Sequence, residues 1–240
     1  MWNTLKYFQF LTSKLTNILY PSRCPLCGNF TDSFHYAPIC KSCWNQIKRY
    51  AGASCRICAL PLSSAYSNVC GQCLKQMPPF SKVISYGLYE GVLAEAINQL
   101  KFSGVKRLSQ PLGKLLLDLD IPDNDGIIPV PLSRKGLLKR GFNQSLLISR
   151  IVAKKTGIPL LMNILLKKRE TLPQVGLSAH DRLVNLRNAF EVKGYVKGMH
   201  LLLIDDVMTT GATVTECSKE LLKSGAAEVV VLTLARAGIM

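Results

Sequence analysis

Short continuous runs of apolar residues recur along the chain beyond residue 80. The runs at 82–89, 126–130, 200–205 and 228–235 have the length of buried strands, and a weaker run at 160–167 predicts one more strand. The run at 200–205 is the clearest of them. Apolar character without alternation is typical of strands that are covered on both faces of a sheet.

Helical periodicity separates these runs. Apolar residues spaced three and four apart predict helices at 92–104, 109–119, 144–155 and 213–224. Strands that alternate with helices in this way are typical of a parallel sheet covered by helices. We therefore expect an α/β domain with a parallel sheet over residues 80–240.

The first 22 residues have the pattern of an amphipathic helix. Six apolar side chains fall on one helical face: Leu5, Phe8, Leu11, Leu15, Ile18 and Leu19. We expect this face to pack on the protein itself. The alternative is a helix on a membrane surface, which would place the protein peripherally at the inner face of the membrane. No apolar run approaches the roughly 18–20 residues of a transmembrane segment, and no signal peptide is evident.

Residues 23–77 form a module dominated by cysteine. Eight of the nine cysteines make four CxxC pairs, separated by 12, 11 and 11 residues. The pairs are Cys24 with Cys27, Cys40 with Cys43, Cys55 with Cys58, and Cys70 with Cys73. Two such pairs supply the four thiolates of a tetrahedral zinc site, so the module predicts two zinc ions. Four protein ligands leave no open position on the metal, which indicates a structural role.

Two alternatives remain for these cysteines. Disulfides would use the same residues, but they need an oxidising compartment, and the chain shows no secretion signal. Zinc is therefore the preferred interpretation. Joining neighbouring CxxC pairs would keep each intervening loop short, whereas the spacing alone does not exclude crossed pairing.

The charge of the chain is strongly positive and unevenly spread. The net charge is +15, and between residues 131 and 190 twelve Lys or Arg residues are opposed only by Glu170 and Asp181. Such an excess suits phosphorylated small molecules or a nucleic-acid backbone. The alternative is a solvated basic surface without a partner.

The strand at 200–205 leads into a stretch with its own chemistry, LLLIDDVMTTGAT. Gly211 lets the backbone approach an anion, and the free amides at the start of the next helix suit a phosphate monoester. Three threonines add hydroxyl donors: Thr209, Thr210 and Thr213. Asp205 and Asp206 would repel phosphate, so they need ribose hydroxyls, or a Mg²⁺ ion held on those hydroxyls. The stretch therefore predicts a ribose-phosphate site.

This stretch resembles the phosphoribosyl diphosphate (PRPP) motif of type I phosphoribosyltransferases. By that resemblance Asp205 and Asp206 bind the ribose hydroxyls and are the candidate catalytic residues, with Mg²⁺ bound together with PRPP. The 5′-phosphate would lie on a loop made of Met208, Thr209, Thr210, Gly211, Ala212 and Thr213. The resemblance implies a type I phosphoribosyltransferase-like domain. A decayed loop that no longer binds PRPP is the alternative.

A longer resemblance covers almost the whole chain. The segment PVPLSRKGLLKRGFNQS at 129–145, the residues around Arg169 and Asn185, and the CxxC pairs ahead of them are together similar to the ComF family, which includes GntX-like proteins. This similarity implies a cytoplasmic protein of natural transformation that handles incoming single-stranded DNA. It also implies competence-machinery proteins as partners.

The same resemblance assigns two basic segments. The stretch that follows the strand at 126–130 would be the turn that wraps pyrophosphate, with donors from Ser133, Arg134, Lys135 and Arg140. For the start of the next helix, the alternative is that Phe142 simply packs inward. Residues 167–187 would be the flexible lid over PRPP, with Lys168, Arg169, Gln174 and Arg182 as its polar side chains.

The activity stays open between classes. A phosphoribosyltransferase would transfer ribose 5-phosphate from PRPP to a nitrogen nucleophile and release pyrophosphate. Only residues 236–240 follow the last predicted strand, so either the zinc module covers the acceptor or the acceptor is a larger molecule. The rivals are a nucleic-acid-binding protein that uses or senses PRPP, and an adaptor that docks proteins through its ribbons. The preferred interpretation is a ComF-like PRPP-binding protein of DNA uptake; an active phosphoribosyltransferase of nucleotide metabolism is the alternative.

Overall fold

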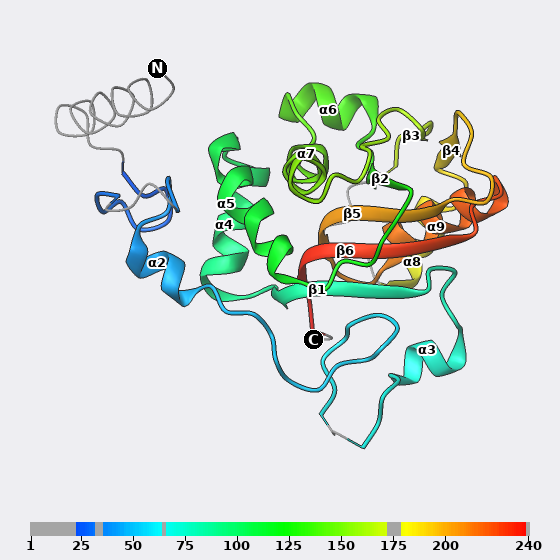
Figure 1. Ribbon diagram of the computed structural model, residues 1–240, viewed down its shortest axis with the longest axis horizontal. Coiled ribbons are helices and arrows are strands. Elements are labelled where there is room, and N and C mark those ends of the chain that lie inside the picture. Colours follow the sequence, from blue (N-terminus) through cyan, green and yellow to red (C-terminus); the bar gives the residue numbers. More distant parts are fainter. Residues whose placement is uncertain (1–22, 32–35, 64–65, 172–178, 239–240) are drawn as a thin grey trace.

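The computed structural model describes residues 23–31, 36–63, 66–171 and 179–238. The helix predicted for residues 1–22 lies outside these ranges. The centre of the molecule is a sheet of four parallel strands in the order β1–β6–β5–β2 (Figure 1). The strands are β1 (Lys82–Leu88), β2 (Gly126–Pro129), β5 (His200–Met208) and β6 (Glu228–Arg236). The predicted class, an α/β domain with a parallel sheet, is confirmed.

The register of the sheet explains why the strand sequences are apolar without alternation. Val83, Val231, Leu203 and Ile128 align side by side across the four strands, and all four lie in one hydrophobic cluster. Their chain neighbours point to the opposite face and belong to a second cluster. Because both faces are covered, both sets of side chains must be apolar.

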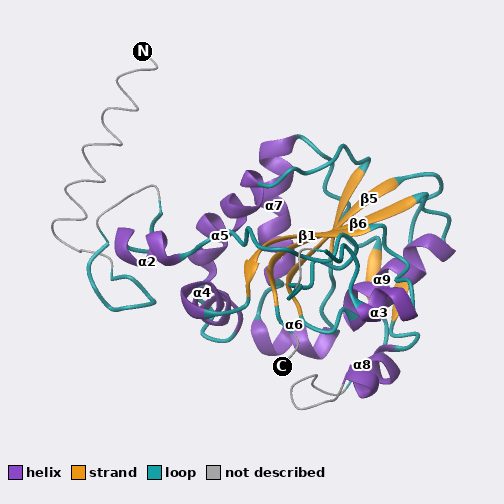
Figure 2. Ribbon diagram, turned by 90° about the horizontal axis from the view of Figure 1, so that it is seen from below, coloured by secondary structure: helices purple, strands orange, loops and turns teal. Residues whose placement is uncertain are grey.

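Helices cover the two faces of the sheet. Figure 2 shows α4 and α5 on one side and α8 and α9 on the other. The helices of this domain are α4 (Gly91–Lys101), α5 (Ser109–Leu115), α6 (Arg134–Arg140), α7 (Gln144–Thr156), α8 (Ala179–Leu186) and α9 (Ala212–Lys223). Short 3-10 turns, η1 (Lys106–Leu108) and η2 (Leu116–Asp118), flank α5. No helix among the described residues is long and apolar enough to cross a bilayer.

Three elements differ from the sequence-based prediction. The run at 160–167 is not one strand: Leu160 forms a single bridge to Ile127, Asn163 turns the chain at a φ of 63°, and only β3 (Leu165–Lys167) is extended. β3 pairs antiparallel with β4 (Phe190–Val192) in a separate two-stranded sheet. The helix predicted over 109–119 tightens into η2 after Leu115.

The third difference is α6, in a stretch that the prediction treated as a turn. Ser133 caps this helix, since its Oγ accepts a hydrogen bond from the Gly136 amide at 3.1 Å. Gly141, at a φ of 76°, ends it. The turn after β2 is therefore confined to the few residues between Pro129 and Arg134.

The cysteine-rich module packs on both faces of the α/β domain. Its first half, with α2 (Lys41–Gln46), shares a hydrophobic cluster with α4, α5 and α7. Its second half, with α3 (Gly71–Lys75), shares the other cluster with α9. A backbone hydrogen bond from the Val83 amide to the Ile57 carbonyl, 2.7 Å, ties this second half to the edge strand β1.

Candidate functional site

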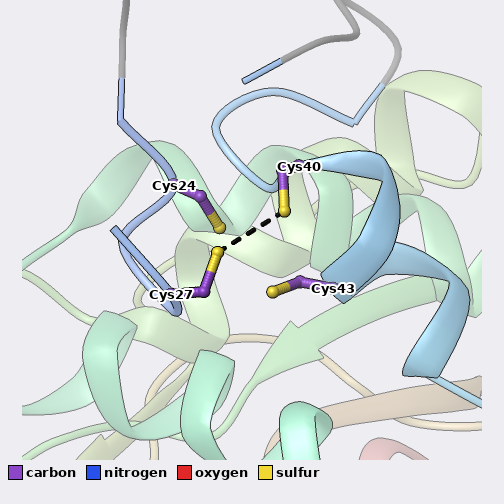
Figure 3. A group of neighbouring side chains, drawn as sticks. All are labelled: Cys24, Cys27, Cys40 and Cys43. Atoms are coloured by element: carbon purple, nitrogen blue, oxygen red, sulfur yellow. Dashed lines mark hydrogen bonds between the residues drawn. The ribbon is translucent and has the colours of Figure 1, made fainter. Parts of the chain in front are cut away.

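Two groups of four cysteines bring their sulfur atoms together. The Sγ atoms of Cys24, Cys27, Cys40 and Cys43 all lie within 4.8 Å of one another, and Figure 3 shows them gathered around one space. The second group is equally close, and its members are Cys55, Cys58, Cys70 and Cys73. Neighbouring CxxC pairs therefore join, which answers the question of pairing that the spacing had left open.

The two groups are built in the same way. In each, an amide that follows the first CxxC pair donates to the carbonyl of the first cysteine: Gly28 to Cys24 and Ala59 to Cys55, both at 2.8 Å. Gly28 and Ala59 both have positive φ, at 75° and 54°. In each group the third cysteine directly precedes a short helix, α2 or α3. The module is thus a structural repeat, with one cysteine cluster in each half.

The chemistry of both groups fits a structural zinc ion. Burial acts to raise the pKa of Cys24 and Cys55, but backbone hydrogen bonds lower each to about 7. Burial and the neighbouring cysteines raise the pKa of Cys43 and Cys73 well above that of an ordinary thiol. Four thiolates held this close are stable only around a cation, and a set of four sulfur ligands is the one that tetrahedral zinc prefers.

The loop between β5 and α9 carries the predicted phosphate site. Gly211 has a left-handed φ of 84°, and a Cβ atom there would come within 2.6 Å of the Met208 Cε. The hydroxyl of Thr210 accepts a hydrogen bond from the Ala212 amide at 3.4 Å. The first amides of a helix have no carbonyl partner within that helix, and at the start of α9 the Thr210 hydroxyl takes this place for Ala212.

Asp205 and Asp206 lie at the end of β5, and both are buried. Asp205 Oδ1 accepts hydrogen bonds from the Ser145 hydroxyl at 3.0 Å and from the Asp206 amide at 2.9 Å. Asp206 faces Lys101, whose Nζ lies 3.1 Å from Oδ1 and 2.9 Å from Oδ2. One acid is thus held by a hydroxyl and the other by an ion pair.

The electrostatics of the acid pair follow from burial. Burial, with the charge of Asp206 second, raises the pKa of Asp205 to about 7. Burial acts to lower the pKa of Lys101, but the charges of Asp206 and Asp205 more than offset it, and the net shift is upward. Lys101 is therefore a cation held in place by the acid pair.

A pocket of about 560 Å³ lies over the acids and the loop. The predicted residues that line it are Arg140, Asp205, Asp206, Met208, Thr209, Gly211, Ala212 and Thr213. Two polar lining residues lie outside every predicted site segment, namely Lys101 and Ser145, and Lys167 is the first residue of the predicted lid. The described part of the zinc module contributes no lining residue, so in these residues it is not the cover over the pocket.

Two further cations complete the pocket wall. The Arg140 guanidinium donates to Gln144 Oε1 at 2.6 Å and lies over the Phe102 ring, 5.6 Å from its centroid. Lys167 Nζ donates to Thr171 Oγ1 at 2.7 Å, and burial lowers the pKa of this amine. Lys101, Arg140 and Lys167 are therefore three basic side chains in the wall of the pocket. The two acids of the pocket both come from β5.

The predicted pyrophosphate donors Ser133, Arg134 and Lys135 do not line this pocket, although Pro131, Leu132 and Gly136 of the same segment do. Ser133 is occupied as the cap of α6, and the Lys135 amide donates to Glu170 Oε1 at 2.9 Å. Arg134 begins α6 and is exposed. A carboxylate of the chain itself thus takes the amide that the prediction offered to pyrophosphate, and of the four predicted residues only Arg140 lines the pocket.

The predicted lid contains α8. Arg169 Nη2 donates to the carbonyls of Asn185 and Arg187, both at 2.9 Å, so this side chain holds the end of α8. The Lys168 amide donates to the Ala189 carbonyl at 2.9 Å. Gln174 and the side chain of Arg182 lie outside the described residues.

Comparison with known proteins identifies the family. A family model described as "Double zinc ribbon domain" matches residues 15–74. "DNA utilization protein YhgH" of Salmonella typhi is 35% identical over 224 residues, 90% of this chain and 97% of that protein. "Competence protein F" of Haemophilus influenzae is 37% identical over 83% of this chain and 90% of its own length.

The chain belongs to the ComF family. A more distant ComF relative, "Competence protein ComFC" of Bacillus subtilis, is 28% identical over 82% of this chain and 84% of that protein. The identity extends over both the zinc module and the α/β domain, because 90% of the chain is covered. The predicted family is confirmed.

Solved structures also resemble part of this ComF chain. One is the glutamine PRPP amidotransferase of Bacillus subtilis, 23% identical over 57% of this chain and 30% of that chain, with a TM-score of 0.42. Another is a phosphoribosyltransferase of Corynebacterium diphtheriae, 20% identical over 60% of this chain and 90% of that chain, with a TM-score of 0.34.

Proposed function

We propose that this ComF-family protein binds PRPP with Mg²⁺ in the pocket between β2, β5 and α9. One observation carries the proposal: the two buried acids and the loop that begins at Met208 line the same pocket. Only Val207 separates the acids from the loop in the sequence. The acids suit a sugar diol and the loop suits a phosphate. A single ligand that offers both a sugar diol and a phosphate matches this arrangement.

The basic side chains support a diphosphate on the same ligand. Lys101, Arg140 and Lys167 line the pocket from three different elements, and the charges of Lys101 and Arg140 lie near both acids. PRPP carries its diphosphate on C1 of the ribose, across the ring from the 5′-phosphate. The negative charge of the diphosphate therefore requires cations away from the loop. On this account Lys101 neutralises Asp206 in the free protein and then shares its charge with the diphosphate.

The acid pair also fits the metal that accompanies PRPP. Carboxylate oxygens are the ligands that Mg²⁺ prefers, and Asp205 and Asp206 are the acids that line the described part of the pocket. When bound, Mg²⁺ would supply charge neutralisation for the diphosphate. The protein's own groups orient the ribose through the two aspartates and fix the 5′-phosphate on the loop.

We further propose a role in DNA uptake, in handling single-stranded DNA during natural transformation. The support is the family, whose members carry the names competence protein F and DNA utilization protein, together with the net charge of +15. An active phosphoribosyltransferase of nucleotide metabolism is the second candidate. The same pocket favours it, since a leaving diphosphate would find cations there.

Isothermal titration with Mg²⁺·PRPP tests the binding. We expect one binding site per chain in the wild type and at least a tenfold weaker affinity in Asp206→Asn, because the variant loses a charge beside the ribose. Asp123→Asn is the matched control, since Asp123 is an exposed acid just before β2, and it should leave the affinity unchanged. Absence of binding in the wild type at millimolar PRPP would rule the proposal out. Pyrophosphate release with added acceptors then separates the two candidates.

A further inference from the structure

Arg236 joins the second cysteine cluster to the loop of the candidate pocket. This last residue of β6 is only 3% exposed. Its Nε donates to the Cys58 carbonyl at 3.0 Å, and its Nη1 donates to the Met208 carbonyl at 3.0 Å and to the Thr209 carbonyl. One rigid guanidinium therefore spans a metal-binding turn and the start of the phosphate loop.

The charge of Arg236 is balanced by the cluster. Among the described residues no Asp or Glu forms an ion pair with it. A divalent zinc ion with four thiolate ligands keeps a net negative charge, so the loaded cluster is the counter-charge for this buried cation.

The loop that Arg236 holds lies between two cavities. The pocket of about 560 Å³ lies on one side, and a second cavity of about 820 Å³ lies between α3, α8 and α9. Met208 and Gly211 line both cavities. Close packing fixes a segment when atoms surround it, so a loop with space on two sides depends on its hydrogen bonds for its conformation.

The first cysteine cluster has no comparable link to the loop. It packs against α4 and α5, and none of its described residues lines either cavity. An arginine of the module does reach the α/β domain on this side: Arg49 Nη1 donates to the Asp118 carbonyl at 3.0 Å. That contact lies at the end of η2, away from the loop.

We propose that zinc in the second cluster sets the conformation of the phosphate loop through Arg236, a positioning residue, whereas zinc in the first cluster only stabilises its own half of the module. The consequence for PRPP affinity rests on the proposed function. The consequence for the loop does not, because the link is present in the ligand-free protein.

The first experiment is hydrogen exchange on the full-length, zinc-loaded protein without PRPP. Arg236→Lys keeps the charge but loses the fork that reaches Cys58 and Met208 together, so we expect amides of residues 208–213 to exchange at least tenfold faster. Zinc content should stay at two per chain, and exchange in α7 should not change. The control is Arg49→Lys, which makes the same Arg-to-Lys change at the contact between the module and the Asp118 carbonyl, and it should leave exchange at 208–213 unchanged. Unchanged exchange at 208–213 in Arg236→Lys would overturn the proposal.

The second experiment removes each zinc site in turn. Cys40 and Cys70 are equivalent, since each directly precedes a short helix in its own half of the module. Both Cys→Ser variants should retain one zinc per chain, but only Cys70→Ser should speed exchange at 208–213 and weaken PRPP binding about tenfold. Equal effects of the two variants, or no effect of Cys70→Ser on the loop, would refute the link. If the wild type binds no PRPP, the exchange data still decide this proposal separately.

Discussion

Asp205 is buried in β5 directly beside the charge of Asp206, and both features disfavour the ionised form of Asp205. Burial, followed by the charge of Asp206, raises the pKa of Asp205 from an ordinary 3.8 to about 7. Between about pH 4 and pH 7 the folded protein binds a proton at Asp205 that the unfolded chain has released. The ligand-free protein therefore loses stability as the pH rises through that window.

The variant Asp205→Asn tests how much folding stability the ionisation of Asp205 costs. The amide keeps an oxygen acceptor for Ser145 and for the Asp206 amide, but it does not ionise. We expect the variant to be roughly 1–2 kcal/mol more stable than the wild type at pH 8 and no more stable than the wild type at pH 4. Each kcal/mol corresponds to a shift of about 2–4 °C in Tm. Thermal unfolding without Mg²⁺ and PRPP measures both. A gain that is the same at the two pH values would contradict the assigned pKa.

Gly211 is the residue on which the loop conformation depends most directly. Gly211→Ala forces a side chain into a φ of 84° and against the Met208 Cε, so we expect a loss of about 1–2 kcal/mol in stability and at least tenfold in PRPP affinity. Gly157→Ala is the control, because Gly157 has a φ of 80° with no atom near its missing Cβ. It should lose similar stability but bind PRPP normally. Calorimetry that finds equal PRPP affinities in both variants would count against the loop as the phosphate site.

At the scale of elements, the ribbons depend on metal because their own cores are small. Each cysteine cluster packs against apolar residues of the α/β domain. Loss of zinc would therefore leave four cysteines without their metal at a buried contact. We expect two zinc ions per chain by atomic absorption. A strong chelator should remove both and abolish the exchange protection of the Gly28 and Ala59 amides, which close the two metal-binding turns. Protection that survives complete zinc removal would show that another bond, such as a disulfide, holds the module.

The strands and the cysteine groups were predictable because their signals are local. The runs that became β1, β2, β5 and β6 are apolar on both faces, and each CxxC pair lies within a single turn. The two-stranded sheet of β3 and β4 was missed because its strands have three residues each and α8 lies between them in the sequence. For α6, the basic character of the segment suggested an anion-binding turn, although the Ser133 cap and Gly141 are ordinary helix boundaries.

The partners of the site residues could not be predicted in the same way. Lys101 meets Asp206 across 105 positions of the chain, Ser145 meets Asp205 across 60, and Arg236 meets Cys58 across 178. No periodicity or spacing encodes such contacts, because they arise only when the sheet order is known. The acids and the loop were found from sequence because they are consecutive, while the groups that tune and hold them were not.

For the whole molecule, the net charge predicts how it meets nucleic acid. If single-stranded DNA binds mainly through its phosphates, counterions are released, and affinity must fall as salt rises. We expect the affinity for an oligothymidine probe to fall at least tenfold between 50 and 200 mM NaCl, measured by fluorescence anisotropy. Binding that does not change with salt, or no binding at low salt, would remove DNA contact from the account.

The most direct measurement is a crystal structure of the protein with Mg²⁺·PRPP. We predict that the 5′-phosphate lies on the amides of residues 209–213, the ribose hydroxyls at Asp205 and Asp206, and the diphosphate toward Lys101 and Arg140. PRPP bound elsewhere, for example in the cavity beside α3, or a filled pocket in which Asp206 still pairs only with Lys101, would contradict this prediction.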